Sequence, residues 1–401
     1  MRACMVAYTF YEEDNRVRRY AETLVDHGWN VDVFVLRTNG QSFKSVIKGV
    51  NVHRIQKRVL NEKGRLTYLY RTMKFLMKSF FLVSKKQLLN KYDIVHIHSI
   101  PDYEIFAAIL PKFSGSKIIL DIHDLVPELY TAKFIKKDNT FLFKVLLLLE
   151  KLSTSFADYV IIANHIWYER LIQRSVNDKK CSVIMNYPDE KIFGNTKRDR
   201  KDEDFLIVYP GALSKHQGID IAIKAISILK NEIPQIRFHI YGDGTDKKYL
   251  QELAQTQMVT KEVKFFDSVP LEEIAQIMAN ADIGVEPKLK NSFSDEAFST
   301  KILEFMLLRI PVIVSDTTVH QYYFDSKVVR FFEAGNYCKL AECIKLLYYD
   351  KELRKQYIQN ANEFIEQMMW GKRKTEYMAI IKKLLNNKVI KNKINLHQHS
   401  C

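Results

Sequence analysis

Short apolar runs alternate along the first half of the chain with longer segments whose apolar residues recur at helical spacing. Runs of this length predict buried strands, and the spaced segments predict the helices between them. Because strand and helix alternate, we expect parallel βαβ units in this half. The expected strands cover residues 4–8, 31–36, 94–98, 117–122, 159–163 and 182–185.

The same alternation begins again after a polar, charge-dense stretch at residues 194–204. We therefore expect an α/β protein with two Rossmann-like domains, residues 1–190 and 191–371, whose parallel sheets face a central cleft that binds the ligand. A C-terminal helix at about residues 372–390 is expected to pack back on the first domain, with a basic tail at 386–401. The expected strands of the second half cover residues 205–209, 237–241, 263–266, 282–286 and 312–314.

One segment, SDEAFSTKILEFMLLRIPVIVSD at residues 294–316, combines charged residues with a strongly apolar stretch. Ser299 is a favourable helix cap, residues 300–308 contain no helix breaker, and Pro311 leads into a short β-branched run, which predicts a loop, a helix and a buried strand. Lys301 then lies in the first helical turn, where the helix dipole disfavours a cation and favours an anion. A bound phosphate would reconcile the two.

Glu304 follows in the same helix, among residues that are apolar on nearly every side. We expect its carboxylate to be partly enclosed, and an enclosed carboxylate needs hydrogen-bond donors such as hydroxyl groups. The alternative is an ordinary surface glutamate beside a lysine whose charge reaches water. The local sequence leaves both interpretations open.

The composition is that of a globular protein. With 401 residues, 47% hydrophobic content and 12% aromatics, the chain can bury large cores, which excludes disordered and fibrous classes. Its five cysteines have no CxxC spacing, so we expect free thiols and neither a disulfide framework nor a zinc site. Residues 1–10 lack the apolar segment of a signal peptide, and the apolar stretches at 75–83 and 142–149 are too short or too charged to span a bilayer, so we expect a cytoplasmic protein.

A formal charge of +14 and a pI near 9.3 favour an anionic partner. The lysines are scattered through globular segments, and the chain has no zinc-finger or RNA-recognition aromatic signature, so we expect no nucleic-acid partner. A phosphorylated small molecule and an acidic lipid surface remain as candidates.

The helical pattern at residues 66–89 mixes aromatic and aliphatic residues with five basic residues. A basic amphipathic helix of this kind can lie on a membrane and attract acidic lipids. It can equally be an ordinary helix that packs on the sheet with its cations in water. The exposure of Phe80 and Phe81 distinguishes the two.

Other residues with candidate chemistry follow predicted strands. Gly211 and Gly218 flank a strand-to-helix turn, and IYGDG at residues 240–244 places Gly242 in a second turn; backbone amides freed by such turns can hold phosphate oxygens. His123 and Asp124 follow another strand, and active-site residues gather at such strand ends in α/β proteins, although a lone histidine is often structural.

Taken together, the motifs resemble glycosyltransferase family 4, the group 1 retaining nucleotide-sugar transferases of the GT-B fold. The resemblance covers most of the chain and rests on the order and spacing of several elements. They are the E-x7-E pair Glu296 and Glu304 with FSTKILEFM and PVIVS, then GALSKHQG, IYGDG, ADIGVEP, DIVHIHS and LDIHD.

The resemblance implies roles for residues that match the family motifs. Glu304 would bind the ribose hydroxyls, and Glu296 and His123 would act on the transferred sugar as the catalytic residues. Ser299, Thr300 and Lys301 would hold the diphosphate. The other implied donor-binding residues are Gly211, Lys215, Gly218 and Gly242. Neither a metal nor another cofactor is required, and no nucleophile is evident.

The chain also departs from the family pattern. Members often have an arginine after the first glycine of the phosphate loop and a lysine before the second, where this chain has Ala212 and Gln217. We therefore expect Lys301, with Lys215 as a second candidate, to neutralise more of the phosphate charge. The glycine-rich loop that many members have after the first strand is absent. Asn15 and Arg16 stand nearby and, with Asp124, are weaker candidates for the acceptor side.

The DED triplet at residues 202–204 lies in the linker before a strand. A run of solvated charges explains it better than a Mg²⁺ site does.

From the resemblance we expect a glycosyltransferase that moves a sugar from a nucleoside diphosphate sugar to a glycan or lipid-linked acceptor, with bacterial surface polysaccharide synthesis as its setting. Two alternatives stay open: a GT-B nucleotide-sugar epimerase, and a non-catalytic subunit that binds nucleotide sugars.

Overall fold

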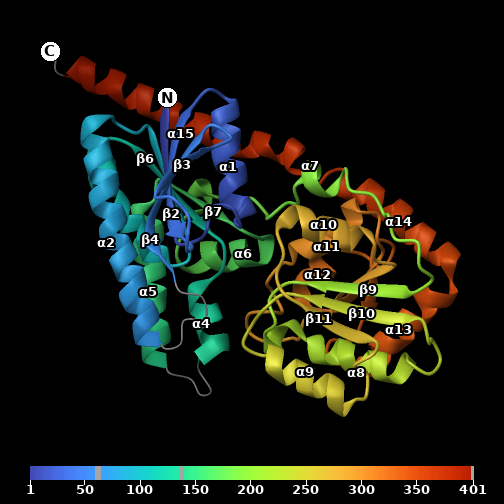
Figure 1. Cartoon of the computed structure of the whole chain (residues 1–401). Coiled ribbons are helices and arrows are strands. Elements are labelled where there is room, and N and C mark those ends of the chain that lie inside the picture. The colour runs from blue at the N-terminus through green and yellow to red at the C-terminus, as the bar shows by residue number, and fades with distance from the viewer. Residues whose placement is uncertain (59–64, 135–139, 399–401) are drawn as a thin grey trace. The chain divides into compact units, whose positions relative to one another are not determined.

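The computed structural model describes residues 1–58, 65–134 and 140–398, with the side chains of residues 65, 132–134, 140 and 387–398 left out. The chain forms two compact units, each built around a mostly parallel sheet (Figure 1). Unit 1 comprises Met1–Asn186 and Arg373–Cys401, and unit 2 comprises Tyr187–Lys372. The predicted α/β class with two Rossmann-like sheets is confirmed.

The sheet of unit 1 has the strand order β3-β4-β2-β1-β5-β6-β7-β8. Its central strand β1 pairs in parallel with β2, where Ala3 lies opposite Val31, and with β5, where Ala3 lies opposite Ile94. Every residue of β5 is buried, as the apolar runs of a doubly covered parallel sheet require. The strands are β1 (Arg2–Ala7), β2 (Asn30–Arg37), β3 (Lys44–Ile47), β4 (Val50–Lys57), β5 (Ile94–His98), β6 (Lys117–Ile122), β7 (Tyr159–Ile162) and β8 (Cys181–Val183).

The hairpin of β3 and β4 was not predicted from the sequence. These two strands pair antiparallel at the edge of the sheet, and β4 alternates buried with partly exposed residues. Lys48 and Gly49 form the turn with positive φ angles of 47° and 80°. A half-polar edge strand lacks the continuous apolar run by which the other strands were identified.

Helices cover both faces of this sheet. The helix that follows β1 is capped by Asp14, whose carboxylate accepts hydrogen bonds from the backbone amides of Arg16 and Val17. The helices are α1 (Asn15–Asp26), α2 (Arg65–Leu89), α3 (Ile109–Phe113), α4 (Val126–Phe134), α5 (Thr140–Phe156), α6 (His165–Arg174) and α15 (Trp370–Gln398), with 3₁₀ segments at Asp102–Ala108 and Asp178–Lys180.

The last helix, α15, returns to unit 1 from Arg373 onward. There Tyr377 is fully buried, its ring centre lies 4.4 Å from that of Tyr20, and its hydroxyl lies 3.2 Å from Nδ1 of His96. The helix continues to Gln398, so most of the segment expected as a tail at 386–401 is helical. The side chains beyond residue 386 lie outside the described residues.

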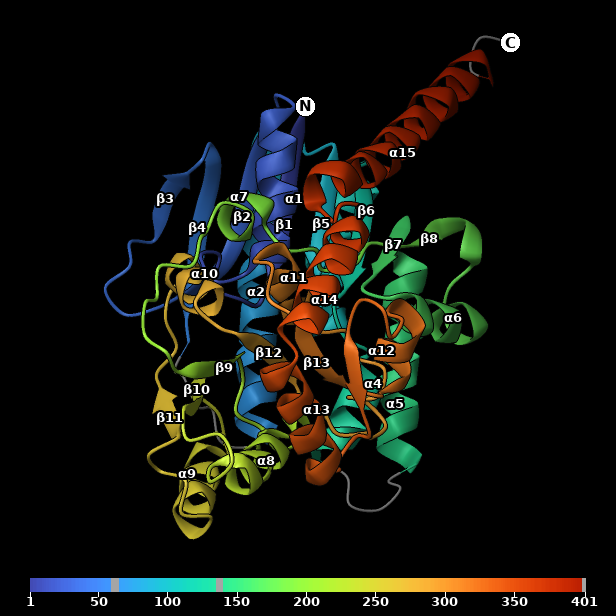
Figure 2. The ribbon, with the colours of Figure 1, turned by 90° about the vertical axis from the view of Figure 1, so that its right-hand side faces the viewer.

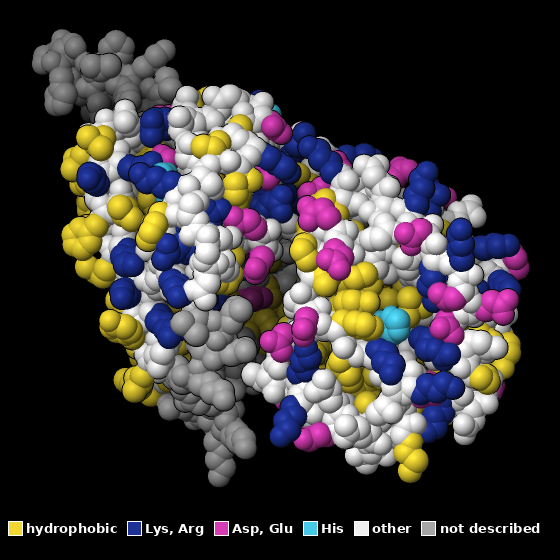
Figure 3. Space-filling view, viewed as in Figure 1, with side chains coloured by type: hydrophobic (Ala, Val, Ile, Leu, Met, Phe, Trp, Pro, Cys, Tyr) yellow, Lys and Arg dark blue, Asp and Glu magenta, His cyan; other side chains and the backbone are white. Residues whose placement is uncertain are grey.

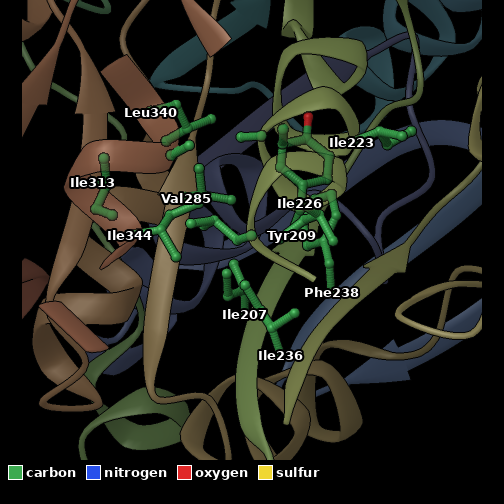
Figure 4. Packing of buried hydrophobic residues seen from close by; sticks show 14 of the residues in the cluster. Ile207, Tyr209, Ile223, Ile226, Ile236, Phe238, Val285, Ile313, Leu340 and Ile344 are labelled. Atoms are coloured by element: carbon green, nitrogen blue, oxygen red, sulfur yellow. The ribbon is translucent and has the colours of Figure 1, made fainter. Parts of the chain in front are cut away.

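The sheet of unit 2 is entirely parallel, in the order β11-β10-β9-β12-β13-β14. Helices α8 and α13 pack side by side on one face (Figures 1 and 2). In the core, Ile223 and Ile226 of α8 meet strand residues such as Ile207 and Phe238 (Figure 4). The strands are β9 (Phe205–Pro210), β10 (Ile236–Tyr241), β11 (Val263–Phe266), β12 (Ile283–Glu286), β13 (Val312–Ser315) and β14 (Arg330–Phe332).

Only β14, a three-residue strand at the sheet edge, was not expected in this unit. The helices are α7 (Glu190–Phe193), α8 (Ile219–Leu229), α9 (Lys247–Thr256), α10 (Leu271–Ala279), α11 (Thr300–Leu307), α12 (Thr318–Tyr323), α13 (Tyr337–Tyr349) and α14 (Lys351–Ile365), with a 3₁₀ segment at Lys215–Gln217. In the described part of the chain, no helix of either unit combines the length and apolar character needed to cross a membrane.

Candidate functional site

A cavity of about 460 Å³ opens at the carboxyl ends of the strands of unit 2. Loops that follow β9, β10 and β11, the end of β12 and the first turns of α11 form its walls. Its size is within the range of small-molecule sites. The lining residues are Pro210, Gly211, Ala212, Gln217, Tyr241, Gly242, Ser268, Val269, Ile274, Met278, Glu286, Lys288, Phe298, Ser299, Thr300, Lys301 and Glu304.

Two glycines allow the loops of this unit 2 cavity to approach each other. Gly211 and Gly242 have φ angles of 139° and 151°, which side chains rarely adopt. A Cβ atom on Gly242 would lie 1.9 Å from the carbonyl oxygen of Gly211, and one on Gly211 would lie 3.3 Å from Nζ of Lys301. A side chain at either position would strain the backbone and crowd a neighbour. Glycine at both positions therefore allows the backbone of the two turns to lie at the cavity wall.

Helix α11 begins where the sequence predicted. Ser299 is the N-cap residue, but its side chain makes no capping hydrogen bond, so the expected cap is present in position and not in function. Ser299, Thr300, Lys301 and Glu304 all line the cavity. Glu304 is half-buried, which confirms that its carboxylate is partly enclosed.

Lys301 has a partner that sequence reasoning missed. Its Nζ lies 2.8 Å from Oε2 of Glu286 and 4.1 Å from the ring centre of Tyr209, while Nζ of Lys288 lies 3.8 Å from the other oxygen of Glu286. Burial favours the neutral form of Glu286, but Lys301 and Lys288 outweigh it and hold the pKa of that carboxyl below its usual value. Burial likewise disfavours the charged form of Lys301, but Glu286 raises the pKa of the ammonium well above its ordinary value.

The only sequence signal for Glu286 was its position, an acidic residue that ends an apolar strand at the carboxyl edge of a sheet. Tyr241, Ser268 and Val269 also line the cavity and were not singled out. They lie at the end of a strand or in a loop without a recognisable motif.

The structure brings six of the eight predicted donor-binding residues together in the cavity wall and leaves two, Lys215 and Gly218, outside it, as it does the predicted catalytic residue Glu296. Lys215 is exposed on its 3₁₀ turn, and Glu296 is half-buried in the loop before α11. Gly218 is buried with φ 67°, and a Cβ there would lie 1.9 Å from the carbonyl oxygen of Pro287, so this glycine allows close packing beside the cavity. The six that line it are Gly211, Gly242, Ser299, Thr300, Lys301 and Glu304.

In unit 1, four side chains that include two predicted site residues form a buried cluster. Nε and Nη2 of Arg16 lie 2.7 and 2.6 Å from the two carboxylate oxygens of Asp121. Nε2 of His123 and Nδ1 of His98 each lie 3.1 Å from Oδ2 of Asp121, and 3.2 Å from each other. Arg16 therefore fixes the Asp121 carboxylate, which in turn orients His123, and Arg16 itself is buried.

This cluster has charges that suit hydrogen bonding. Burial disfavours the charged form of Asp121, but Arg16 and His123 hold the pKa of its carboxyl well below the usual range. Burial lowers the pKa of His98, which keeps its ring neutral. Ligand atoms of His96, His98 and Asp121 lie within 4.8 Å of one another, but the guanidinium of Arg16 occupies both oxygens of Asp121 and its charge opposes a cation, so we assign them no metal.

The weaker acceptor-side candidates are found in different places. Asp124 and His123 line a second cavity, of about 250 Å³, within unit 1. Asn15 is half-buried in the first turn of α1 and is not among the residues that line this unit 1 cavity.

Two family models match the chain. The glycosyl transferase 4-like domain matches residues 14–186, and glycosyl transferases group 1 matches residues 192–364. The putative glycosyltransferase EpsD of Bacillus subtilis is 24% identical over 280 residues, which cover 66% of this chain and 69% of EpsD. The O-antigen biosynthesis glycosyltransferase WclY of Escherichia coli is 25% identical over 257 residues, 61% of this chain and 67% of WclY.

Solved structures with a similar fold cover nearly the whole chain. Sucrose-phosphate synthase from Thermosynechococcus elongatus has a TM-score of 0.78 at 15% identity, covering 96% of this chain and 99% of its own. Anabaena HepE in complex with UDP-glucose has a TM-score of 0.71 at 17% identity, covering 96% and 100%. With one family model on each unit and this shared GT-B fold, the chain belongs to the group 1 glycosyltransferases.

Proposed function

We propose that this glycosyltransferase moves a sugar, with retention of anomeric configuration, from a nucleoside diphosphate sugar to a glycan or lipid-linked acceptor in bacterial surface polysaccharide synthesis. The main support for this proposal is the unit 2 cavity. Its wall combines Lys301 and Glu304 of α11 with the turns that contain Gly211 and Gly242. WclY is an O-antigen biosynthesis glycosyltransferase, which supports the setting, and HepE binds UDP-glucose, which supports the donor class.

The chemistry of the cavity suits the two ends of a nucleoside diphosphate sugar. Lys301 stays protonated at physiological pH because Glu286 raises its pKa, so it offers a permanent positive charge to the leaving diphosphate. The half-buried carboxylate of Glu304 can accept two hydrogen bonds from the ribose hydroxyls. Glu296 and His123 are proposed to act on the transferred sugar, as the resemblance implies, and Gly218 and Lys215 to support the phosphate turn.

We infer that the transfer needs no divalent cation. The carboxylates that line the unit 2 cavity among the described residues are Glu286 and Glu304. Glu286 already balances two lysines, so its charge is not available to a metal ion. Transfer should therefore continue at an unchanged rate when EDTA is added.

The test is a thermal-shift screen against UDP, GDP, ADP and their common sugar conjugates, since a ligand that binds only the folded protein raises its melting temperature. We expect one nucleotide to raise the Tm clearly. Glu304→Ala should weaken its binding by about 1 to 3 kcal/mol through the loss of hydrogen bonds to the ribose. Glu252→Ala, on the exposed face of α9, is the control and should bind like the wild type. The absence of a shift with every nucleotide would contradict the proposal.

We further propose that α2 seats the protein on the inner face of an acidic membrane. The helix contains no acidic residue and carries basic residues along its length. Phe81 is 62% exposed, Met77 48% and Leu88 76%, while Phe80 is half-buried. Figure 3 shows hydrophobic and basic side chains interspersed along the edge of unit 1 that α2 forms. Exposed apolar side chains beside lysines match the interior and the anionic headgroups of such a membrane.

A further inference from the structure

We propose that Lys288 and Asp295 are positioning residues for the transfer, and that together they clamp the turn of unit 2 that carries Glu296. The inference rests on the proposed function, in which Glu296 acts on the transferred sugar, and it adds the two side chains that hold Glu296 in place. It draws on the loop between β12 and α11, on the contacts at either side of Glu296, and on the carboxylate that Lys288 shares with Lys301.

The loop that carries Glu296 is long and irregular. It spans residues 287–299, all of them described, and contains neither helix nor strand between the end of β12 and the start of α11. One turn orders it locally, because the amides of Glu296 and Ala297 both donate to the carbonyl oxygen of Phe293, at 3.2 and 3.1 Å. This turn must still be attached to the rest of the unit if Glu296 is to meet a sugar in a fixed geometry.

On one side of Glu296, Asp295 fastens the turn to α12. Its two carboxylate oxygens accept hydrogen bonds from the backbone amide and the hydroxyl of Thr318, at 2.9 and 2.6 Å. Its carbonyl oxygen accepts another from the amide of Val319, at 2.9 Å. The N-cap residue of α12, Thr317, makes no capping bond with its side chain to the described residues, so Asp295 satisfies amides that this cap leaves over.

On the other side, Lys288 fastens the turn to the end of β12. Its Nζ donates a hydrogen bond of 2.7 Å to the carbonyl oxygen of Ala297, the residue that follows Glu296. Lys288 is 5% exposed and Ala297 7%, so water competes little for a bond that the ammonium charge already strengthens. Glu296 therefore lies between two neighbours that are each anchored to a different element.

Lys288 also connects this clamp to the phosphate side of the cavity. Its Nζ lies 3.8 Å from Oε1 of Glu286, and Oε2 of the same carboxylate lies 2.8 Å from Nζ of Lys301. Both lysines line the unit 2 cavity. One buried carboxylate thus helps to place both the lysine proposed for the diphosphate and the lysine that holds the turn of Glu296.

The test separates the sugar from the diphosphate. A purely structural lysine would affect a nucleoside diphosphate and its sugar conjugate alike, whereas a displaced Glu296 weakens only contacts to the sugar. Titration calorimetry with UDP and UDP-glucose or UDP-N-acetylglucosamine, GDP and GDP-mannose, and ADP and ADP-glucose gives the ratio of the Kd of each nucleotide sugar to that of its nucleoside diphosphate. For the pair that binds, Lys288→Met and Asp295→Ala should each raise this ratio by about threefold to tenfold, the loss of one hydrogen bond.

Two further variants are the controls. Asp295→Asn keeps an oxygen that can accept from the amide of Thr318, so its ratio should return close to that of the wild type. Lys290→Met changes a lysine of the same loop whose side chain is 48% exposed in its ion pair with Asp316, and it should leave the ratio unchanged.

A double-mutant cycle tests whether the clamp acts through Glu296. Glu296→Ala should raise the ratio by itself, and Lys288→Met or Asp295→Ala added to it should raise the ratio no further. The inference is overturned if neither clamp variant changes the ratio, if Glu296→Ala leaves it unchanged, or if the clamp variants raise it as much without Glu296 as with it. None of these outcomes touches the proposed glycosyl transfer, which fails instead if no nucleotide shifts the Tm.

Discussion

At the scale of single residues, the contact between Lys301 and Glu286 explains how a lysine can stand in the first turn of a helix. The helix dipole opposes a cation there, but the carboxylate of Glu286 at 2.8 Å compensates for it. Tyr209 below and Gly211 beside the ammonium leave it room at the cavity wall. The pair therefore holds a charge in place before any anion arrives, which limits the reorganisation that binding requires.

Replacing Lys301 should show how much each end of the donor, the diphosphate and the nucleoside, depends on this lysine for binding. We expect Lys301→Met to weaken nucleoside diphosphates by about tenfold or more, and bare nucleosides little, because a charge-assisted contact to the phosphates is lost. Titration calorimetry with a nucleoside diphosphate and its nucleoside measures both.

The single variant leaves Glu286 buried with only Lys288 nearby, so a general loss of stability needs a control. Lys301→Met combined with Glu286→Gln removes both charges and should keep the melting temperature closer to that of the wild type. Equal losses for nucleoside and diphosphate in the double variant would argue against a phosphate role for Lys301.

At the scale of elements, the turns after β9 and β10 are positioned by glycine. The Cβ of an alanine at residue 242 would overlap the carbonyl oxygen of Gly211 at 1.9 Å, whereas at Gly28, which also has positive φ at 79°, nothing lies within 4 Å. Both φ angles are positive, but 151° at Gly242 is a value that essentially only glycine adopts, whereas 79° at Gly28 is close to the left-handed region that other residues can enter. Gly242→Ala therefore combines backbone strain with displacement of a neighbouring loop, and Gly28→Ala has the milder backbone strain alone.

We expect Gly242→Ala to lower the free energy of unfolding by about 2 to 4 kcal/mol, and Gly28→Ala by only about 1 kcal/mol from its φ angle. Chemical denaturation compares the two. Gly242→Ala should also weaken nucleotide binding, because it moves the cavity wall, while Gly28→Ala should leave binding intact. Similar costs at both sites would mean that the close approach of the turns is not a constraint.

The exposed face of α2 makes a second prediction at this scale. Phe81→Asp should reduce cosedimentation with vesicles that contain phosphatidylglycerol, because it removes an apolar contact and adds a charge that anionic lipids repel. Met258→Asp, at a site 79% exposed in unit 2, is the control and should sediment like the wild type. Binding that is as strong to pure phosphatidylcholine as to the anionic vesicles would contradict the role of the lysines.

At the scale of the whole molecule, the net charge of +14 contrasts with a set of carboxylates enclosed in unit 1. Asp102 opens the 3₁₀ segment after β5, is nearly fully buried, and accepts a hydrogen bond of 2.5 Å from Oγ of Ser99. Burial raises its pKa to about 7, although the bond from Ser99 opposes the change. Between about pH 4 and pH 7 the folded protein therefore keeps a proton on Asp102 that the unfolded chain has released.

The sign of the pH dependence follows from this raised pKa. Between about pH 4 and pH 7 the folded state binds more protons at Asp102 than the unfolded state, so this group makes the protein less stable as pH rises through that window. Asp102→Asn removes the effect. We expect the free energy of unfolding of the wild type to fall relative to that of the variant between pH 5 and pH 8, as measured by urea denaturation; parallel curves would show that Asp102 titrates normally.

Much of the architecture was readable in advance because its determinants are local or periodic. Continuous apolar runs such as residues 94–98 identified doubly covered strands, and Ser299, Lys301 and Glu304 were placed correctly around the start of α11. The hairpin of β3 and β4 escaped prediction because one of its faces is partly polar. Residue type and spacing were enough wherever burial was complete or a helix boundary was marked.

The pairings across the fold were decided by tertiary structure. Glu286 and Lys301 lie fifteen residues apart on different elements, and nothing local states that their charges meet. Arg16 and Asp121 are joined across 105 positions of the chain, which turned a candidate acceptor residue into the support of His123. The sequence by itself determined which elements form and which residue types stand at strand ends. Only the assembly of the strands into each sheet decided which of those side chains share a cavity. The reason is that contact between distant segments depends on strand order and not on spacing along the chain.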